Sequence, residues 1–210
     1  MKFNFRKSQD FPPLFRIGDG PALDIVSEAK ILGIIIQDNL KFSSHVKYMI
    51  TRAYKKIWTL RRLKLLDLNM EILTDFYCKE VRSILEYGVT VWNSSLTKTM
   101  KDQIERIQRI SINIILCNTS RDISYNVGCT LLNLEPLFYR REELCIRFIQ
   151  KASQDPQHSD MFVRNKNTFN TRNTRLEYRE YSCRNKRFYD SPLCYLTRLL
   201  NKHPVKHMKN

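Results

Sequence analysis

Residues 31–66 constrain the fold of this chain more than any other stretch. An apolar run of six residues, from Ile31 to Ile36, comes first and favours a buried strand. A polar break follows, and after Ser44 apolar residues recur at three- and four-residue spacing, which forms one stripe along a helix. The stripe consists of Val46, Met49, Ile50, Ala53, Ile57 and Leu60. The pattern predicts a strand followed by a helix that docks on a core.

Lysine and arginine occupy the rest of this helix. Positions 39–66 hold eight basic residues and no acid: Lys41, Lys47, Arg52, Lys55, Lys56, Arg61, Arg62 and Lys64. Because a solvated helix face normally mixes both signs of charge, this pattern favours a surface that faces a polyanion. A merely solvated outer face is the alternative. The residues expected to contact phosphates are Lys47, Lys55, Arg61 and Arg62, through contacts that depend on salt and not on base sequence.

The composition of the whole chain agrees with a nucleic-acid partner. A formal charge of +15 on 210 residues is typical of proteins that meet nucleic acid or an anionic membrane. No apolar stretch approaches the roughly 20 residues that span a bilayer, and the N-terminus lacks the apolar segment of a signal peptide. We therefore expect an intracellular protein, in a nuclear or cytoplasmic ribonucleoprotein, with no membrane partner.

Six cysteines are scattered without a Cys-x-x-Cys pair, which is typical of small apolar residues in a reducing compartment. A zinc site would have to use Cys183, Cys194, His203 and His207. Their spacing matches no common module, and Pro204 breaks the helical spacing between the histidines. The sequence therefore predicts neither a disulfide framework nor a zinc site.

The order of the elements predicts a mainly α fold. Two short apolar runs around a glycine-bearing turn, at 14–17 and 23–26, predict a hairpin. Helical periodicity predicts helices over 69–87, 97–117, 124–132, 136–153 and 192–200, and residues 89–92 are expected to be extended or a tight bend. In the helix over 97–117 the expected buried residues are Ile104, Ile107, Ile110 or Ser111, Ile114 and Ile115. We divide the chain into a β piece (1–40), a helical bundle (41–153) and a basic C-terminal region (154–210).

The C-terminal region mixes basic and aromatic residues. From residue 161 onward there are twelve basic residues and three acids. The aromatic residues among them resemble platforms on which the bases of a single strand stack: Tyr178, Tyr181, Phe188 and Tyr189. Arg184 and Arg187 are the phosphate contacts we expect here, and a poorly ordered basic tail is the alternative.

Four strings occur in an order and at distances that are specific to one family: ILGIIIQDNLKFSSHV, VRSILEYGVTVWNSSL, QIERIQRISINIIL and LEPLFYRREEL. With them, the chain resembles the region after the catalytic palm in reverse transcriptases of non-LTR (LINE-type, jockey-like) retrotransposons. The resemblance implies a helical thumb and a C-terminal connector that clamp RNA, DNA or their hybrid. It also implies a remnant of the palm at the N-terminal β piece.

The chain departs from that family where polymerase chemistry is concerned. The family needs an aromatic-x-Asp-Asp turn and further carboxylates to bind two divalent metals. This sequence contains no Asp-Asp pair. We therefore expect no catalytic residue and no cofactor in this chain, since Mg²⁺ is implied only for the missing palm. The chain is then a truncated part of an RNA-directed DNA polymerase.

For other residues in the four strings we expect a structural role, or a role that is either structural or in phosphate binding. Leu32, Gly33, Tyr87 and Trp92 are expected to be structural, the last two as a buried aromatic pair that closes a helix end. Glu86 is expected to pair with Arg82, four residues earlier. Arg140 and Arg141 are expected to pair either with Glu142 or Glu143 or with a phosphate, and His45 to serve in packing or capping.

Two further hypotheses compete with a nucleic-acid clamp. A host-adopted helical interaction protein would bind a partner through the helix at 97–117 and would tolerate moderate salt. A remnant that never folds stably would expose the strand at 31–36 and aggregate. The sequence does not predict an oligomeric state.

Overall fold

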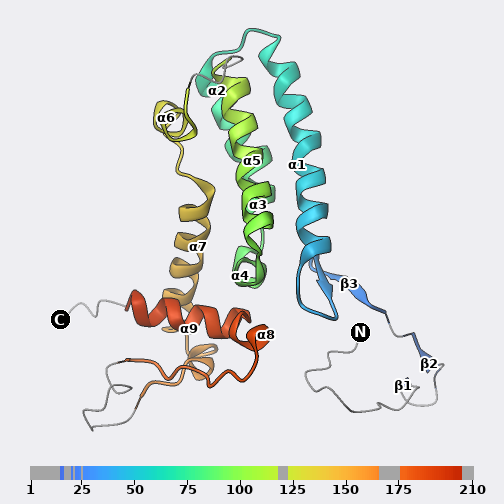
Figure 1. The fold of residues 1–210 in the computed structure, drawn as a ribbon, viewed down its shortest axis with the longest axis vertical. Helices are drawn as coiled ribbons and strands as arrows, with labels where there is room; N and C mark the ends of the chain where they lie inside the picture. The colour runs from blue at the N-terminus through green and yellow to red at the C-terminus, as the bar shows by residue number, and fades with distance from the viewer. Residues whose placement is uncertain are drawn as a thin grey trace.

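The computed structural model describes residues 15–16, 20, 22–24, 26–117, 123–165 and 176–204. It confirms a mainly helical fold with small antiparallel β elements near the N-terminus (Figure 1). The helical segments α1, α5 and α2–η1–α3 stand upright side by side, and α9 crosses the lower end of α7 (Figure 1). Among the described residues, no helix is both long and apolar enough to cross a membrane.

The helix α1 (Ser43–Lys64) begins and packs as its sequence predicts. Five of the six stripe residues are buried and Ile50 is partly buried. Its first turn is capped from outside the helix, because the Gln37 side chain accepts hydrogen bonds from the Ser43 hydroxyl (2.9 Å) and the Ser44 N–H (3.1 Å). The stripe packs against α5 and the η1–α3 segment.

The apolar run at 31–36 does not form the single buried strand that we expected. It is divided between β3 (Glu28–Ile31) and β4 (Ile34–Gln37), which pair antiparallel with Ile31 opposite Ile34. Leu32 (φ 47°) and Gly33 (φ 84°) form the turn, with the two positive φ angles of a type I′ hairpin. Ile34 is buried, whereas Leu32 is 86% exposed. The expected first hairpin is confirmed by β1 (Phe15–Arg16) and β2 (Ala22–Leu23).

The helix predicted over 69–87 is present, with an irregular middle. It consists of α2 (Met70–Phe76), the π-helix η1 (Tyr77–Arg82) and α3 (Ser83–Glu86), and the Asn69 side chain caps it by accepting from the Ile72 N–H at 2.9 Å. The π-helical turn was not predicted. Gly88 follows with φ 62°, and α4 (Val89–Trp92) is a one-turn helix, which neither the extended form nor the tight bend predicted.

The remaining predicted helices are confirmed. They are α5 (Lys98–Ile115), α6 (Tyr125–Leu131), α7 (Leu137–Ala152) and α9 (Pro192–Lys202). In α5 the buried residue is Ser111 and not Ile110, and Ile114 is only partly buried because Ile112 lies closer to the core. Two 3₁₀ turns, η2 (Asn93–Ser95) and η3 (Ser159–Met161), and the short α8 (Lys186–Tyr189) connect these helices. The helix α9 packs on α7 and buries Leu199 and Leu200.

Trp92 and Tyr87 lie close to the place where the hairpin meets the bundle. Trp92 is fully buried, and its indole N–H donates to the Tyr87 carbonyl at 2.9 Å. Tyr87 itself is 57% exposed, so the expected buried aromatic pair is wrong. The Tyr87 hydroxyl instead donates to the Leu32 carbonyl at 2.8 Å and thereby fastens the hairpin turn to the end of α3. A Cβ on Gly33 would lie 3.4 Å from the Tyr87 ring.

His45 occupies the interior of the same junction, as expected for a packing residue. It is 3% exposed, its ring centroid lies 5.9 Å from that of Trp92, and its Nδ1 accepts from the Ile35 N–H at 3.3 Å. Burial lowers the pKa of His45 below its ordinary value, because the apolar surroundings disfavour the imidazolium. The neutral ring is the form that can accept this hydrogen bond.

Gly88→Ala should destabilise the protein. A Cβ at this position would lie 2.5 Å from the Ile34 Cδ1, and a positive φ costs a residue with a Cβ about 1–2 kcal/mol. We expect a clear fall in the free energy of unfolding, measured by urea titration with circular dichroism. In an Ile34→Val background, which lacks Cδ1, the same change should cost less. Equal costs in the two backgrounds would exclude the steric contact.

Protonation of His45 should lower the free energy of unfolding as the pH falls. The folded-state pKa is depressed, so below the ordinary value of 6.5 the unfolded chain binds more protons than the folded one. This contribution to stability is complete above that pH and is lost as the pH falls toward the folded-state pKa. His45→Asn keeps an acceptor for the Ile35 N–H and does not titrate. Urea titrations at pH 7.5 and 5.5 should show a smaller difference for the variant than for the parent protein.

Candidate nucleic-acid interface

The exposed face of α1 is a ridge of cations. The apolar stripe fixes the rotation of this helix, so the residues on the opposite side face solvent. The four predicted phosphate contacts on α1 are all exposed: Lys47, Lys55, Arg61 and Arg62. No acid in the described part of the chain lies within ion-pair distance of any of the four. We call these four residues the α1 ridge.

The other cations of α1 contact groups of the protein itself. The Lys56 ammonium forms an ion pair with Glu80 at 2.6 Å, and the Lys64 ammonium donates to the Ile115 carbonyl at 3.1 Å. The Arg52 guanidinium lies 5.7 Å from the centroid of the Tyr48 ring. Lys56 and Lys64 thus have partners on other helices of the bundle.

Exposed aromatic residues lie among the ridge cations. The prediction from the charge pattern of this helix did not include them. Trp58 is 60% exposed and Tyr54 is 43% exposed. The Arg62 guanidinium lies 5.2 Å from the centroid of the Trp58 ring, within the range of a cation–π contact. Both aromatic residues fall outside the apolar stripe, and that helical phase was visible in the sequence.

Arg140 and Arg141 do not belong to the interface. Arg141 is 1% exposed, and its Nη1 lies 3.8 Å from the Glu105 Oε2, so a phosphate cannot reach it. Two nitrogens of the Arg140 guanidinium donate to the Glu86 carboxylate. This hydrogen bonding raises the pKa of Arg140. The expected pairing with Glu142 or Glu143 is also wrong, because both partners come from other helices.

Glu86 and Glu105 are the acids that fix these arginines. Glu86 also lies 3.7 Å from the Arg82 Nε, as its spacing predicts, and Glu105 accepts from the Tyr125 hydroxyl at 2.6 Å. Gln108 completes this polar interior, since it accepts from the Tyr77 hydroxyl at 2.8 Å and donates to the Glu135 carbonyl at 3.0 Å. These hydrogen bonds and ion pairs connect α5 and α7 to the rest of the bundle. The groups that form them serve the structure and do not form a binding surface.

The predicted contacts of the C-terminal region lie apart from the C-terminal half of α1. Arg184 and Arg187 are exposed, the first just before α8 and the second within it. Arg61 and Arg62 belong to the last turn of α1, and that end of α1 lies at the opposite end of the molecule from α8 (Figure 1). Arg184 lines a hollow of about 400 Å³ together with Ser182, Asn185 and Phe188.

The aromatic platforms expected in this region are only partly available. Tyr178 is 2% exposed, so its expected role as a platform is wrong. Tyr181 packs edge-on against Phe188 at 6.2 Å, and the Arg198 guanidinium lies 3.7 Å from the centroid of the Tyr189 ring. Most of these rings are therefore occupied by contacts within the protein.

The four side chains that a zinc site would have to use are only partly described, because His207 lies outside the described residues. The Cys183 and Cys194 sulfurs are 3.7 Å apart. Within the described ranges, no three His, Cys, Asp or Glu side chains are grouped so that they could bind a metal ion.

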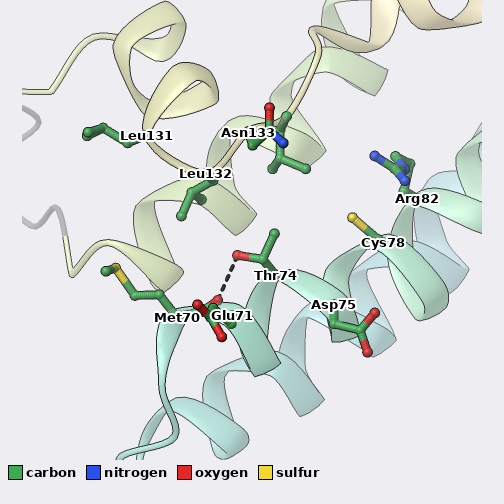
Figure 2. A pocket seen from close by; sticks show the side chains of 10 residues that line it. Met70, Glu71, Thr74, Asp75, Cys78, Arg82, Leu131, Leu132 and Asn133 are labelled. Carbon is green, nitrogen blue, oxygen red and sulfur yellow. Dashed lines mark hydrogen bonds between the residues drawn. The ribbon is translucent and has the colours of Figure 1, made fainter.

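A larger groove of about 580 Å³ lies between the α2–η1 segment and the residues that follow α6 (Figure 2). Met70, Cys78 and Arg82 line one side, and Leu131 and Leu132 line the other (Figure 2). Burial raises the pKa of the Cys78 thiol, so the unreactive thiol form predominates at neutral pH. The lining shows no pairing of a nucleophile with a base.

Arg141→Met should test the structural role of this arginine. The change leaves Glu105 without its buried partner, so we expect the free energy of unfolding to fall by about 3 kcal/mol or more. Arg62→Met, on the exposed ridge, should change it by less than about 0.5 kcal/mol. Urea denaturation of both variants measures the difference. Two equally stable variants would show that Arg141 does not support the core.

Comparison with known proteins gives one informative match. No protein-family model matches the sequence, and no solved structure matches it. The chain is 27% identical over 139 residues to the probable RNA-directed DNA polymerase from transposon BS of Drosophila melanogaster. The match covers 64% of this chain but 14% of that polymerase. The chain is therefore related in sequence to part of a transposon reverse transcriptase.

Proposed function

We propose that this chain is the thumb and C-terminal part of a LINE-type retrotransposon RNA-directed DNA polymerase and grips the backbone of a primer–template. The observation that carries the proposal is the α1 ridge, four exposed cations with no nearby acid on a helix whose other side is anchored in the core. The relation to a transposon polymerase supports the same function.

The geometry of α1 suits contact with a phosphate backbone. The helix has 22 residues and is therefore about 33 Å long, and the ridge from Lys47 to Arg62 extends over about 22 Å. Cations along such a length can neutralise several phosphates and release their counterions. A contact of this kind tracks the backbone of RNA, DNA or their hybrid without reading base sequence.

We assign no catalytic residue to this chain. In the proposal the metal-dependent chemistry belongs to a palm with paired carboxylates, and this chain holds the nucleic acid for it. Intact relatives would use such a region to clamp element RNA and the nicked target DNA during target-primed synthesis.

The alternative of a protein partner bound through the helix at 97–117 has less support. That helix is α5, which lies among α1, α2, α6 and α7. Ile104, Ile107 and Ile115 on α5 are fully buried, so its apolar face is already occupied within this chain.

Removal of ridge charge should weaken binding of nucleic acid. The triple variant Lys47→Gln, Lys55→Gln, Arg61→Gln lowers the formal charge from +15 to +12. We expect its affinity for a 20-base-pair RNA–DNA hybrid at 100 mM salt to fall by about tenfold or more. The slope of log affinity against log salt should become shallower by roughly 2–3. Fluorescence anisotropy from 50 to 200 mM salt measures both quantities.

The matched control is Lys98→Gln, Arg106→Gln, Lys151→Gln, three exposed cations outside α1 with the same change in charge. This variant should retain most of the affinity. If both triple variants lose affinity equally, net charge and not the ridge drives binding. Salt-independent binding would contradict the proposal.

A further inference from the structure

We infer that Trp58 is a stacking site for an unpaired nucleobase, so that α1 holds single-stranded nucleic acid by stacking in addition to the phosphate contacts that it makes with single strands and duplexes alike. This inference rests on the proposed function and adds to it the form of the nucleic acid. The observation that supports it is an exposed indole among cations that have no nearby acid. This combination is typical of proteins that bind single strands.

The exposure of Trp58 needs an explanation that packing does not provide. The sequence has two tryptophans, and Trp92 is fully buried with its indole N–H hydrogen-bonded. Trp58 is 60% exposed, on a helix whose opposite side already fills the core. Exposure of a large aromatic surface to water is unfavourable, and a partner that covers the ring would recover that free energy.

The neighbours of Trp58 favour an anionic partner with a flat face. Lys55 and Arg62 lie three residues before and four residues after it, so all three share one face of the helix. The Arg62 guanidinium is 5.2 Å from the ring centroid, where it can meet a phosphate while the indole meets the attached base. Tyr54, four residues before Trp58 and 43% exposed, offers a second ring on the same side.

Stacking on Trp58 requires a base that is not covered by its own neighbours. In a duplex both faces of each base are covered by adjacent pairs, so a side chain on a helix meets phosphates and groove edges. A single strand can turn its bases outward onto an aromatic ring. Trp58 should therefore contribute to binding of single strands and not of duplexes, whereas the cations contribute to both.

The chain offers a matched control for the aromatic ring itself. Tyr139 on α7 is also 60% exposed. Its helical neighbours three and four residues later are Glu142 and Glu143, which would repel a phosphate. If aromatic exposure alone favoured nucleic acid, Tyr139 would matter as much as Trp58.

Tryptophan fluorescence reads the proposed site directly, because Trp58 is exposed and Trp92 is not. The full chain is titrated with 12-nucleotide oligothymidylate and oligouridylate and with a 12-base-pair RNA–DNA hybrid, and labelled versions give affinities by anisotropy. We expect either single strand to quench the fluorescence strongly and the hybrid to quench it little. In Trp58→Phe the quenching should vanish while most of the affinity remains, since the phenyl ring also stacks.

Trp58→Ala should weaken single-strand binding by roughly tenfold or more and change hybrid binding by less than twofold. Tyr139→Ala should change neither, and the melting temperatures of all three variants should match that of the parent because both side chains are exposed. Equal losses for single strand and hybrid in Trp58→Ala, or ridge-dependent binding without quenching, would overturn the stacking site and leave the backbone grip intact. Absence of binding to every oligonucleotide would instead overturn the proposed function.

Discussion

The packing of the α1 stripe against α5 and the η1–α3 segment is the interaction on which the rest of the structure depends. It buries Val46, Ala53 and Leu60 and so fixes the rotation of a helix that has no acid. Once that rotation is fixed, the ridge cations and Trp58 have to face solvent. The proposed binding surface is thus a consequence of core packing, since no other element is needed to orient it.

Long-range ion pairs then decide which arginines and lysines remain available. Glu86 and Glu105 engage Arg140 and Arg141 between helices, and Glu80 engages Lys56. In a chain with a formal charge of +15, acids are scarce, and in these pairs they lie at helix contacts where an uncompensated cation would be costly. Much of the excess positive charge is thereby left to outer surfaces such as the α1 ridge.

The junction of Trp92, His45 and Gly88 links this bundle to the β3–β4 hairpin. The hairpin is fastened at its turn by Tyr87 and along β4 by His45, while Ile31 and Leu32 remain exposed. Two hydrogen bonds thus hold the hairpin to the bundle while its turn keeps apolar residues exposed.

The sequence by itself determined the longer helices and their starting points, because both depend on residues close together in the chain. The stripe of α1 and the capping side chains of Asn69, Thr97 and Ser124 were all predictable in this way. Only the tertiary structure divided the apolar run at 31–36 into two strands, through a turn in which Leu32 has a positive φ. The hydroxyl of Tyr87, 55 residues further along the chain, holds this turn by a hydrogen bond. The tertiary structure alone removed Arg141 and Tyr178 from the candidate surface. The physical reason is that exposure and ion pairing depend on partners distant in sequence, which helical periodicity does not encode.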